Sequence, residues 1–280
     1  MERLKVLIAV KTYPIPSAKY DELSCTAGVT EDGDFIRLYP INYRDLPWDQ
    51  QFKKYQWIEV MAEKHTGRDF RKESWRPDSD SVTLLGEPIP TSRGGDWSAR
   101  GKYVLRNVAA SMEELRDRQD LDTTSLGIFR PREVMDLVIT PDDAEWKASF
   151  LDELRQARLW ETRTKSKVPP RKIPWRFQYR FRCDDGRCNG RHKMTIEDWE
   201  VGALYWRLVD AGAAPDEAAA KVKQRFLDEI CAPEKETYFY VGTVLSWPKS
   251  WVVIGIFYPR QGKSGSGIGK TGELFTAPGV

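Results

Sequence analysis

Residues 175–193 read WRFQYRFRCDDGRCNGRHK and join a two-faced strand to a cluster of cysteines and a histidine. Side chains alternate along a strand, so one face is aromatic and the other cationic. The first face carries Trp175, Phe177, Tyr179, Phe181 and Cys183. The second carries Arg176, Gln178, Arg180 and Arg182. The aromatic face predicts a packed core or a base-stacking surface, and the cationic face predicts contacts with phosphates.

Positive charge is concentrated around this strand. Residues 163–193 hold eleven Lys or Arg and two acids, whereas the whole chain has a net charge of +2. Such a patch indicates a nucleic-acid partner, with DNA expected more than RNA, while a membrane partner is not expected and no protein partner is predicted. The candidate contacts are Arg171, Lys172, Arg176, Arg180, Arg182 and Arg191, with Lys11 and Tyr20 from a polar loop near the N-terminus. A half-buried strand with a solvated basic face is the alternative.

Length and composition indicate a globular protein, and the pattern of expected strands and helices indicates an α+β fold. The chain has 280 residues, 40% of them hydrophobic, and only four cysteines, which is typical of a cytoplasmic protein and not of a disulfide framework. No nucleotide cofactor is expected. The segment SGSGIGKT near the C-terminus ends like a phosphate loop, but Ser264 replaces its first glycine and too little chain remains after it to form the required helix.

The N-terminal half is predicted to be mainly antiparallel β. Strands are expected at 6–10 and 55–63, with a hairpin over 24–41 and a short strand at 82–85 within loops spanning 68–100. Residues 11–23 are predicted to form a loop. Ser111 and Glu114 match a capping box that opens a helix, a second helix is expected over 143–160, and the apolar run within 129–140 is expected to form a strand.

The C-terminal half is predicted to mix helices and strands around a Cys/His turn. Thr195 is expected to cap a helix ending near Gly212, and Pro215 to open another reaching about Ile230. Residues 236–245 and 251–259 are expected to pair as the closing hairpin. Three regions are predicted. Residues 1–165 form a β-rich region with two later helices, 166–258 hold the basic strand, the Cys/His turn, two helices and the closing hairpin, and 259–280 form a flexible tail.

Cys183, Cys188 and His192 have the spacing of a zinc-binding turn. A structural zinc takes four ligands in tetrahedral array, so a fourth must come from elsewhere in the chain. Cys25, Cys231, His65, Asp184 and Asp185 are the candidates. Two thiols on a loop beside an exposed histidine are the alternative to structural zinc.

Three acids are candidate catalytic residues. A helical projection that starts at Ile196 places Glu200 on the apolar side, close in angle to Arg207, so Glu200 is either half of an interior ion pair or a site carboxylate. Asp198 lies three residues after Thr195 and is most simply a capping-box acid. Glu22 lies in the polar loop and is a secondary candidate.

Many aromatic residues and only two histidines favour chemistry on nucleobases over cleavage of phosphodiesters. Base excision develops positive charge on the sugar, which a single carboxylate can stabilise while aromatic rings stack on the extruded base. We therefore expect a DNA-binding hydrolase of the DNA glycosylase type. The alternatives are a non-catalytic reader of modified bases and a metal-dependent nuclease.

The segments KTYPIPS, YDELSCTAG, RLYPI, SLGIFRP, FQYRFRC with CNGRH, and IEDWE resemble a set of bacterial proteins of uncharacterised activity. Such proteins are often found beside mobile-element and phage-defence genes. The resemblance implies an antiviral defence role by association, and it assigns no catalytic residue.

Overall fold

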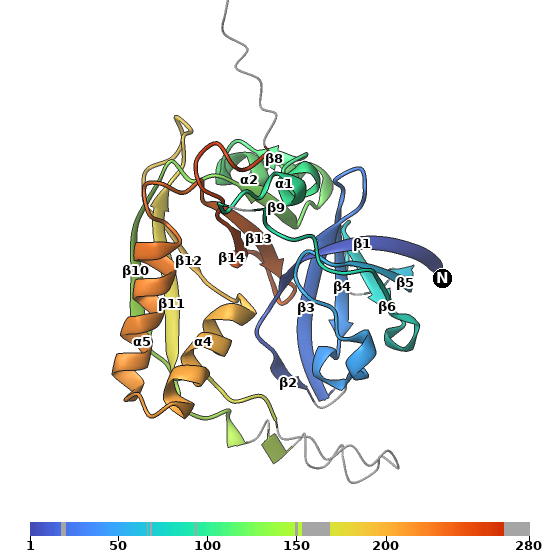
Figure 1. Ribbon diagram of the computed structural model, residues 1–280, viewed down its shortest axis with the longest axis horizontal. Coiled ribbons are helices and arrows are strands. Elements are labelled where there is room, and N and C mark those ends of the chain that lie inside the picture. Colours follow the sequence, from blue (N-terminus) through green and yellow to red (C-terminus); the bar gives the residue numbers. More distant parts are fainter. Residues whose placement is uncertain are drawn as a thin grey trace, which may run out of the picture.

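The structure is a computed structural model that describes residues 1–17, 21–65, 67, 69–92, 94–148, 151–152 and 169–265. It is an α+β fold, as the sequence predicts, with an N-terminal β-barrel beside a C-terminal half of helices and strands (Figure 1). Among the described residues, no helix combines the length and the apolar character needed to cross a membrane.

The barrel is a seven-stranded, mostly antiparallel sheet. Strand β5 pairs with both β1 and β6, so the order β1-β3-β4-β6-β5 closes on itself. Its strands are β1 (Glu2–Lys11), β2 (Ile15–Ser17), β3 (Asp21–Val29), β4 (Phe35–Ile41), β5 (Trp57–Lys64), β6 (Ser74–Pro77) and β7 (Thr83–Leu85). Short 3₁₀ turns cover Tyr43–Asp45, Trp48–Gln50 and Ser79–Ser81.

Strand β1 is buried on both faces, which explains its unbroken apolar run. Val6 and Ile8 point into the barrel, where they pack with Leu38 and Val60. Leu7 belongs to a different core, which lies between the barrel and a second sheet.

Two smaller sheets complete the fold. One has the order β14-β13-β9-β8, and the other is the antiparallel set β10-β11-β12. Their strands are β8 (Val108–Ala109), β9 (Leu126–Phe129), β10 (Glu133–Pro141), β11 (Trp175–Arg182), β12 (His192–Thr195), β13 (Tyr238–Val244) and β14 (Trp247–Phe257). The helices are α1 (Ser98–Val104), α2 (Met112–Asp122), α4 (Trp199–Asp210) and α5 (Pro215–Lys223), which continues as a π-helix, η4 (Gln224–Glu229).

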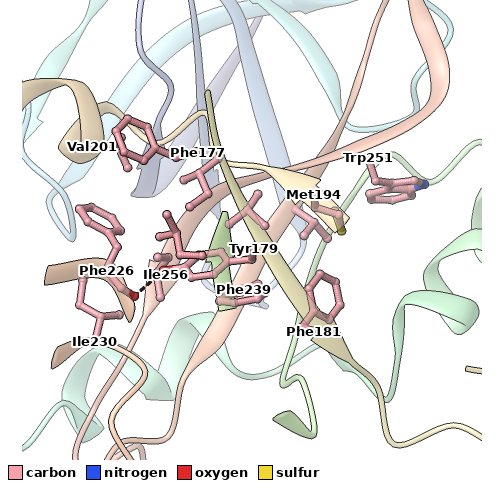
Figure 2. Close-up of a cluster of buried hydrophobic side chains, with 14 of the residues drawn as sticks. Phe177, Tyr179, Phe181, Met194, Val201, Phe226, Ile230, Phe239, Trp251 and Ile256 are labelled. Carbon is pink, nitrogen blue, oxygen red and sulfur yellow. Dashed lines mark hydrogen bonds between the residues drawn. The ribbon is translucent and has the colours of Figure 1, made fainter. Parts of the chain in front are cut away.

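The aromatic face of β11 forms the centre of the largest core. Phe177, Tyr179 and Phe181 are at most 2% exposed, and Figure 2 shows them packed with Phe239 and Phe226. The Tyr179 hydroxyl donates to the Phe226 carbonyl at 2.6 Å, so its polar atom is satisfied inside the core. From Phe177 to Phe181 this face therefore packs the core and is not a surface for stacking on bases, whereas Trp175 at the start of the strand is only partly buried.

Several predicted elements are confirmed. The 24–41 hairpin is β3 and β4, the closing hairpin is β13 and β14, and Ser111 Oγ accepts from the Glu114 amide at 3.0 Å. Gly212 follows α4 with a φ of +95°, the left-handed conformation that glycine adopts readily at a helix end.

Other predictions were wrong. Helix α4 is capped by Asp198, whose side chain accepts from the Glu200 amide, and not by Thr195, because residues up to 198 are extended. The predicted 11–23 loop contains β2, whereas the strand expected within residues 129–140 is confirmed as β10. Residues 143–147 are not helical; most of the helix predicted there, the boundary near 165 and most of the tail lie outside the described residues.

Candidate functional site

The site is built around an extended crossing segment, residues 195–198, which connects β12 to α4. The Glu197 amide donates to the Val253 carbonyl of β14, and the Glu197 carbonyl accepts from the Tyr13 amide, both at 2.8 Å. Asp198 forms a β-bridge with Thr12 just beyond β1. Because side chains alternate along extended backbone, Glu197 and Asp198 point to opposite sides of this segment.

On the Glu197 side lies a pocket of about 220 Å³ that we call the aromatic chamber. Its walls are aromatic and aliphatic, and its few polar groups are charged. The lining residues used below are Tyr13, Ile15, Asp142, Trp146, Lys172, Trp175, Arg176 and Glu197. Aromatic walls with a small number of convergent polar groups are typical of a ligand site.

Tyr13 is positioned by the absence of a side chain at Gly202 in α4. A Cβ there would lie 2.2 Å from the Tyr13 ring, so only glycine permits this approach. The Tyr13 hydroxyl also donates to the Arg171 carbonyl at 2.9 Å. The ring is therefore fixed at both its edge and its hydroxyl.

The Glu197 carboxyl forms no hydrogen bond or ion pair with any described residue. Burial raises its pKa to about 7, the nearby charge of Arg176 opposes this rise, and that of Asp142 adds to it. A carboxyl that titrates near neutral pH can exchange a proton with a ligand. Its lack of a protein partner leaves its oxygens available to whatever fills the chamber.

A second pocket of about 290 Å³, the arginine chamber, adjoins the first and shares Tyr13, Ile15 and Glu197 with it. Its other lining residues include Cys25, Arg37, Tyr39, Arg71, Thr243 and Val252. Arg71 is held by Asp69, with nitrogen–oxygen distances of 2.6 and 2.7 Å. Two arginines and one acid, Glu197, are the charged residues that line this chamber.

Arg37 is only 1% exposed and forms no ion pair with a described carboxylate. It donates to the Ser125 hydroxyl at 2.6 Å, and that hydroxyl donates to Glu73 at 2.6 Å, so the charge is compensated through a relay. Arg37 Nε and the Thr243 hydroxyl are buried without hydrogen-bond partners. Buried polar groups are normally satisfied, so these two indicate a site for a ligand or water.

On the opposite side of the crossing segment, Lys54 joins two of the predicted acids. Its Nζ lies 3.5 Å from Asp198 Oδ2 and 3.1 Å from Glu200 Oε2. Burial opposes the charge of Lys54, but the two carboxylates outweigh it and raise its pKa. Burial raises the pKa of Asp198 to about 6, against the attraction of Lys54.

Lys11 also approaches this group. Its Nζ lies 3.6 Å from the centroid of the Tyr43 ring, and burial with the neighbouring charge of Lys54 lowers its pKa to about 8. The structure therefore brings Lys11, Asp198 and Glu200 together, with Lys54 as the member that the sequence did not indicate. The two cations and two carboxylates compensate one another at the start of α4, so the buried carboxylate of Asp198 is not left without an opposite charge.

Glu200 is not on a buried face, contrary to the prediction. Its side chain is 47% exposed, and its ion pair is with Lys54, not with Arg207. Glu200 and Arg207 line a shared groove of about 540 Å³ between α4 and α5. The helical projection failed because Ile196, from which it started, lies outside the helix; the buried face of α4 carries Val201, Gly202 and Tyr205.

The cationic face of β11 is exposed as predicted, but acids from β10 and the segment after it lie beside it. Arg182 lies 2.5 Å from Glu133, and Arg176 lies 3.6 Å from Asp142. Lys172 shares Asp142 at 3.5 Å. These ion pairs reduce the positive charge of the row, although Lys172 and Arg176 share the single acid Asp142 in the lining of the aromatic chamber.

The remaining candidates are spread out. Arg171 stacks over Trp206 at 3.5 Å and pairs with Asp210, while Arg180 and Arg191 lie exposed further along the β11–β12 sheet. Glu22 is buried on β3 and paired with Arg44 at 3.1 Å. Tyr20 lies outside the described residues.

Cys183, Cys188 and His192 do converge, and the fourth member of the cluster is Glu113 from α2. One ligand atom from each residue lies within 4.8 Å of the others, so the cluster could hold a metal ion. His192 Nε2 lies 2.9 Å from Glu113 Oε1, and neither that nitrogen nor Glu113 Oε2 has a hydrogen-bond partner. Backbone amides donate to both sulfurs, from Met112 to Cys183 and from Gly190 to Cys188, at 3.4 Å each.

The fourth ligands predicted from the sequence were wrong. Cys231 lies against the Phe226 carbonyl, His65 contacts the Tyr39 carbonyl, and Asp185 is held by Ser111 and Arg187. Asp184 pairs with Arg132, and Cys25 lines the arginine chamber.

Sequence reasoning missed Glu197, Lys54 and Glu113. Asp198 is itself a preferred N-cap residue, and a helix starting after it would have left Glu197 on extended backbone. Lys54 and Glu113 come from distant elements, so no local pattern links them to the site. Glu113 lies in the first turn of α2, where an acid is usual.

Fold and site together define an α+β protein in which a closed barrel packs on a second sheet and an unpaired carboxyl faces an aromatic pocket. The chain belongs to the family described as Domain of unknown function (DUF8757), whose model matches residues 108–277. A second model, Domain of unknown function (DUF8758), matches residues 2–106. No curated protein matches the chain.

The raised pKa of Glu197 predicts how stability depends on pH. The folded chain keeps a proton that the unfolded chain loses between about pH 4.5 and about pH 7, so the free energy of unfolding falls as pH rises through that window. Glu197→Gln removes this loss and is expected to stabilise the protein at pH 8 by on the order of 1 kcal/mol, with little effect below about pH 4.5. Urea unfolding across pH measures both.

The matched control is Glu87→Gln, which neutralises an exposed acid outside the site. If both variants change stability equally at every pH, the pKa of Glu197 is not raised by its burial.

Proposed function

We propose that this protein binds nucleic acid, takes one extruded nucleobase into the aromatic chamber and cleaves its N-glycosidic bond. The unpartnered carboxyl of Glu197 between aromatic walls is the observation that carries the proposal. An extruded base needs stacking partners and a polar group that contacts its edge. Tyr13, Trp146 and Trp175 are available for the first role, and Glu197 for the second.

The rim of the chamber supports a nucleic-acid ligand. Lys172 and Arg176 both line it and share Asp142, which leaves one positive charge in excess. A phosphate beside the extruded nucleotide could pair with either cation. Arg180 and Arg191 extend the exposed basic surface away from the rim.

The proposed reaction is hydrolysis. Glu197 donates its proton to the departing base as the bond from the base nitrogen to C1′ of the sugar breaks. Water then adds to C1′ and gives up a proton, which returns to the Glu197 carboxylate and restores the acid. A group with a pKa near the working pH suits this role, and general acid catalysis typically contributes ~10²–10⁴-fold in rate. Modified bases of phage DNA are the substrates that the resemblance to defence-associated proteins favours.

A non-catalytic reader is the second candidate. It is favoured by the fact that Lys172 and Arg176 engage Asp142, the other acid of the chamber wall, while the Asp198 carboxyl is turned away to Lys54. No second carboxylate among the described lining residues is then available to stabilise charge on the sugar. A metal-dependent nuclease has less support, because Lys54 already compensates Asp198 and Glu200.

We also propose that Glu113, Cys183, Cys188 and His192 hold a structural zinc. Two thiolates, an imidazole and a carboxylate are typical zinc ligands, and ligand atoms around tetrahedral zinc lie roughly 3.5–4 Å apart, within reach of the present spread of 4.8 Å. The amide donors to both sulfurs are the outer contacts that thiolate ligands usually receive. Such an ion would join the β11–β12 turn to α2.

Alkaline cleavage tests the catalytic proposal. DNA containing ordinary or modified bases is incubated with the protein, heated in alkali to break abasic sites, and sized on a gel. Glu197→Gln is expected to lower the rate of abasic-site formation by ~10²-fold or more. Glu200→Gln is the control, because that acid lies outside the chamber, and it should retain the activity.

The other outcomes of this assay distinguish the glycosylase from the reader and the nuclease. DNA that is bound but stays intact in alkali supports the reader, and strand breaks without alkali that EDTA abolishes support the nuclease. Loss of activity in Glu200→Gln but not in Glu197→Gln would move the catalytic site to the α4–α5 groove.

Metal analysis tests the zinc proposal. The purified protein is expected to hold about one zinc per chain, and its removal by chelation should lower Tm by roughly 5–10 °C. Glu113→Gln should weaken zinc retention, whereas Asp184→Asn, which removes an exposed acid next to Cys183, should not. Zinc retained equally by both variants contradicts the assignment of Glu113.

A further inference from the structure

The arginine chamber is not needed to hold an ordinary base. The aromatic chamber alone supplies the stacking walls and Glu197, yet a further 290 Å³ opens beyond the shared residues Tyr13, Ile15 and Glu197. A cavity in a folded protein costs stability unless something fills it. Its position predicts that it receives whatever projects from a base held in the first chamber.

The two chambers differ in chemistry. Tyr13, Trp146, Trp175 and Phe177 bring four rings to the first, among charged groups. In the second, Arg37, Arg71 and Thr243 lie among mainly aliphatic side chains. Arg37 is 1% exposed and Thr243 is 6% exposed. Arg37 Nε and the Thr243 hydroxyl are buried in two of the lining residues and have no partner, so a ligand that brings acceptors and reaches them would satisfy two donors.

We propose that the arginine chamber binds an oxygen-bearing substituent of the nucleobase, such as a hydroxymethyl, carboxyl or sugar group, and so selects modified over unmodified bases. This inference rests on the proposed binding of a base in the aromatic chamber. An oxygen of the substituent would accept hydrogen bonds from Arg37 Nε and the Thr243 hydroxyl. Without it, water would have to accept them. A methyl group alone would leave both donors unsatisfied, and such a mismatch is costly in a buried site.

The proposal is tested by fluorescence anisotropy with oligonucleotides that differ at one base: cytosine, methylcytosine, hydroxymethylcytosine, its glucosylated form and carboxylcytosine. The wild-type protein is expected to bind the oxygen-bearing forms at least about tenfold more tightly than cytosine or methylcytosine. Glu197→Gln is used for this comparison as well, so that excision does not consume the probes.

Thr243→Val is the discriminating variant. Its unpartnered hydroxyl makes no folding contact, so the substitution should keep or raise the free energy of unfolding while it reduces the preference for oxygen-bearing bases. Thr26→Val is the matched control, because the Thr26 hydroxyl is equally buried and unpartnered but lies outside both chambers. Val252→Phe fills the chamber and should reduce binding of the glucosylated base while cytosine binding stays unchanged.

Reduced preference in either chamber variant, with Thr26→Val unchanged, supports the proposal. Equal affinity for all five bases, or a preference that survives both Thr243→Val and Val252→Phe, overturns it while base binding itself stands. Absence of binding to every oligonucleotide instead overturns the proposed function.

Discussion

The crossing segment of residues 195–198 is the constraint on which the site depends. Its backbone is hydrogen-bonded on one side to Val253 of β14 and on the other to Tyr13, just beyond β1. It therefore joins the barrel, the closing hairpin of β13 and β14, and α4 at one point. Extended geometry then decides the rest: Ile196 enters the core, Glu197 faces the chambers, and Asp198 turns to Lys54 and caps the helix.

The different contacts of Asp198 and Glu197 explain their different electrostatic free energies. Asp198 is 1% exposed, and it is tolerated because Lys54 and the Glu200 amide both contact it. Glu197 has no such contacts, so its charge is penalised and its proton is retained to higher pH. A buried polar group without a partner lowers stability, and such groups persist mainly where function requires them. The same reasoning applies to Arg37 Nε and the Thr243 hydroxyl in the adjoining chamber.

The sequence predicts those parts of the fold that local patterns determine. Side-chain alternation predicts the two faces of β11. The capping box of Ser111 and Glu114 predicts the start of α2, and the cysteine spacing predicts three members of the candidate metal cluster. The start of α4 was misplaced by three residues, because Thr195 and Asp198 are both good caps. Pairing of the crossing segment with β14 decides between them, and that pairing is a tertiary interaction without a local signal. Because the predicted start of α4 was wrong, the sequence indicated Glu200 as the candidate acid, whereas the structure indicates Glu197.

Strand β11 connects the two proposed sites. Its position between them matters more for the proposed function than its own row of basic side chains. It begins at the aromatic chamber with Trp175 and Arg176, and Cys183 of the metal cluster follows its end. Hydrogen bonds to β10 on one edge and β12 on the other make it a rigid spacer between them. An ion that fixes Cys183 and His192 to α2 would thus fix both strands, and β12 leads directly into the crossing segment. With an ion bound, the proposed metal site would support the chamber through this path, because it would restrain the backbone that carries Glu197.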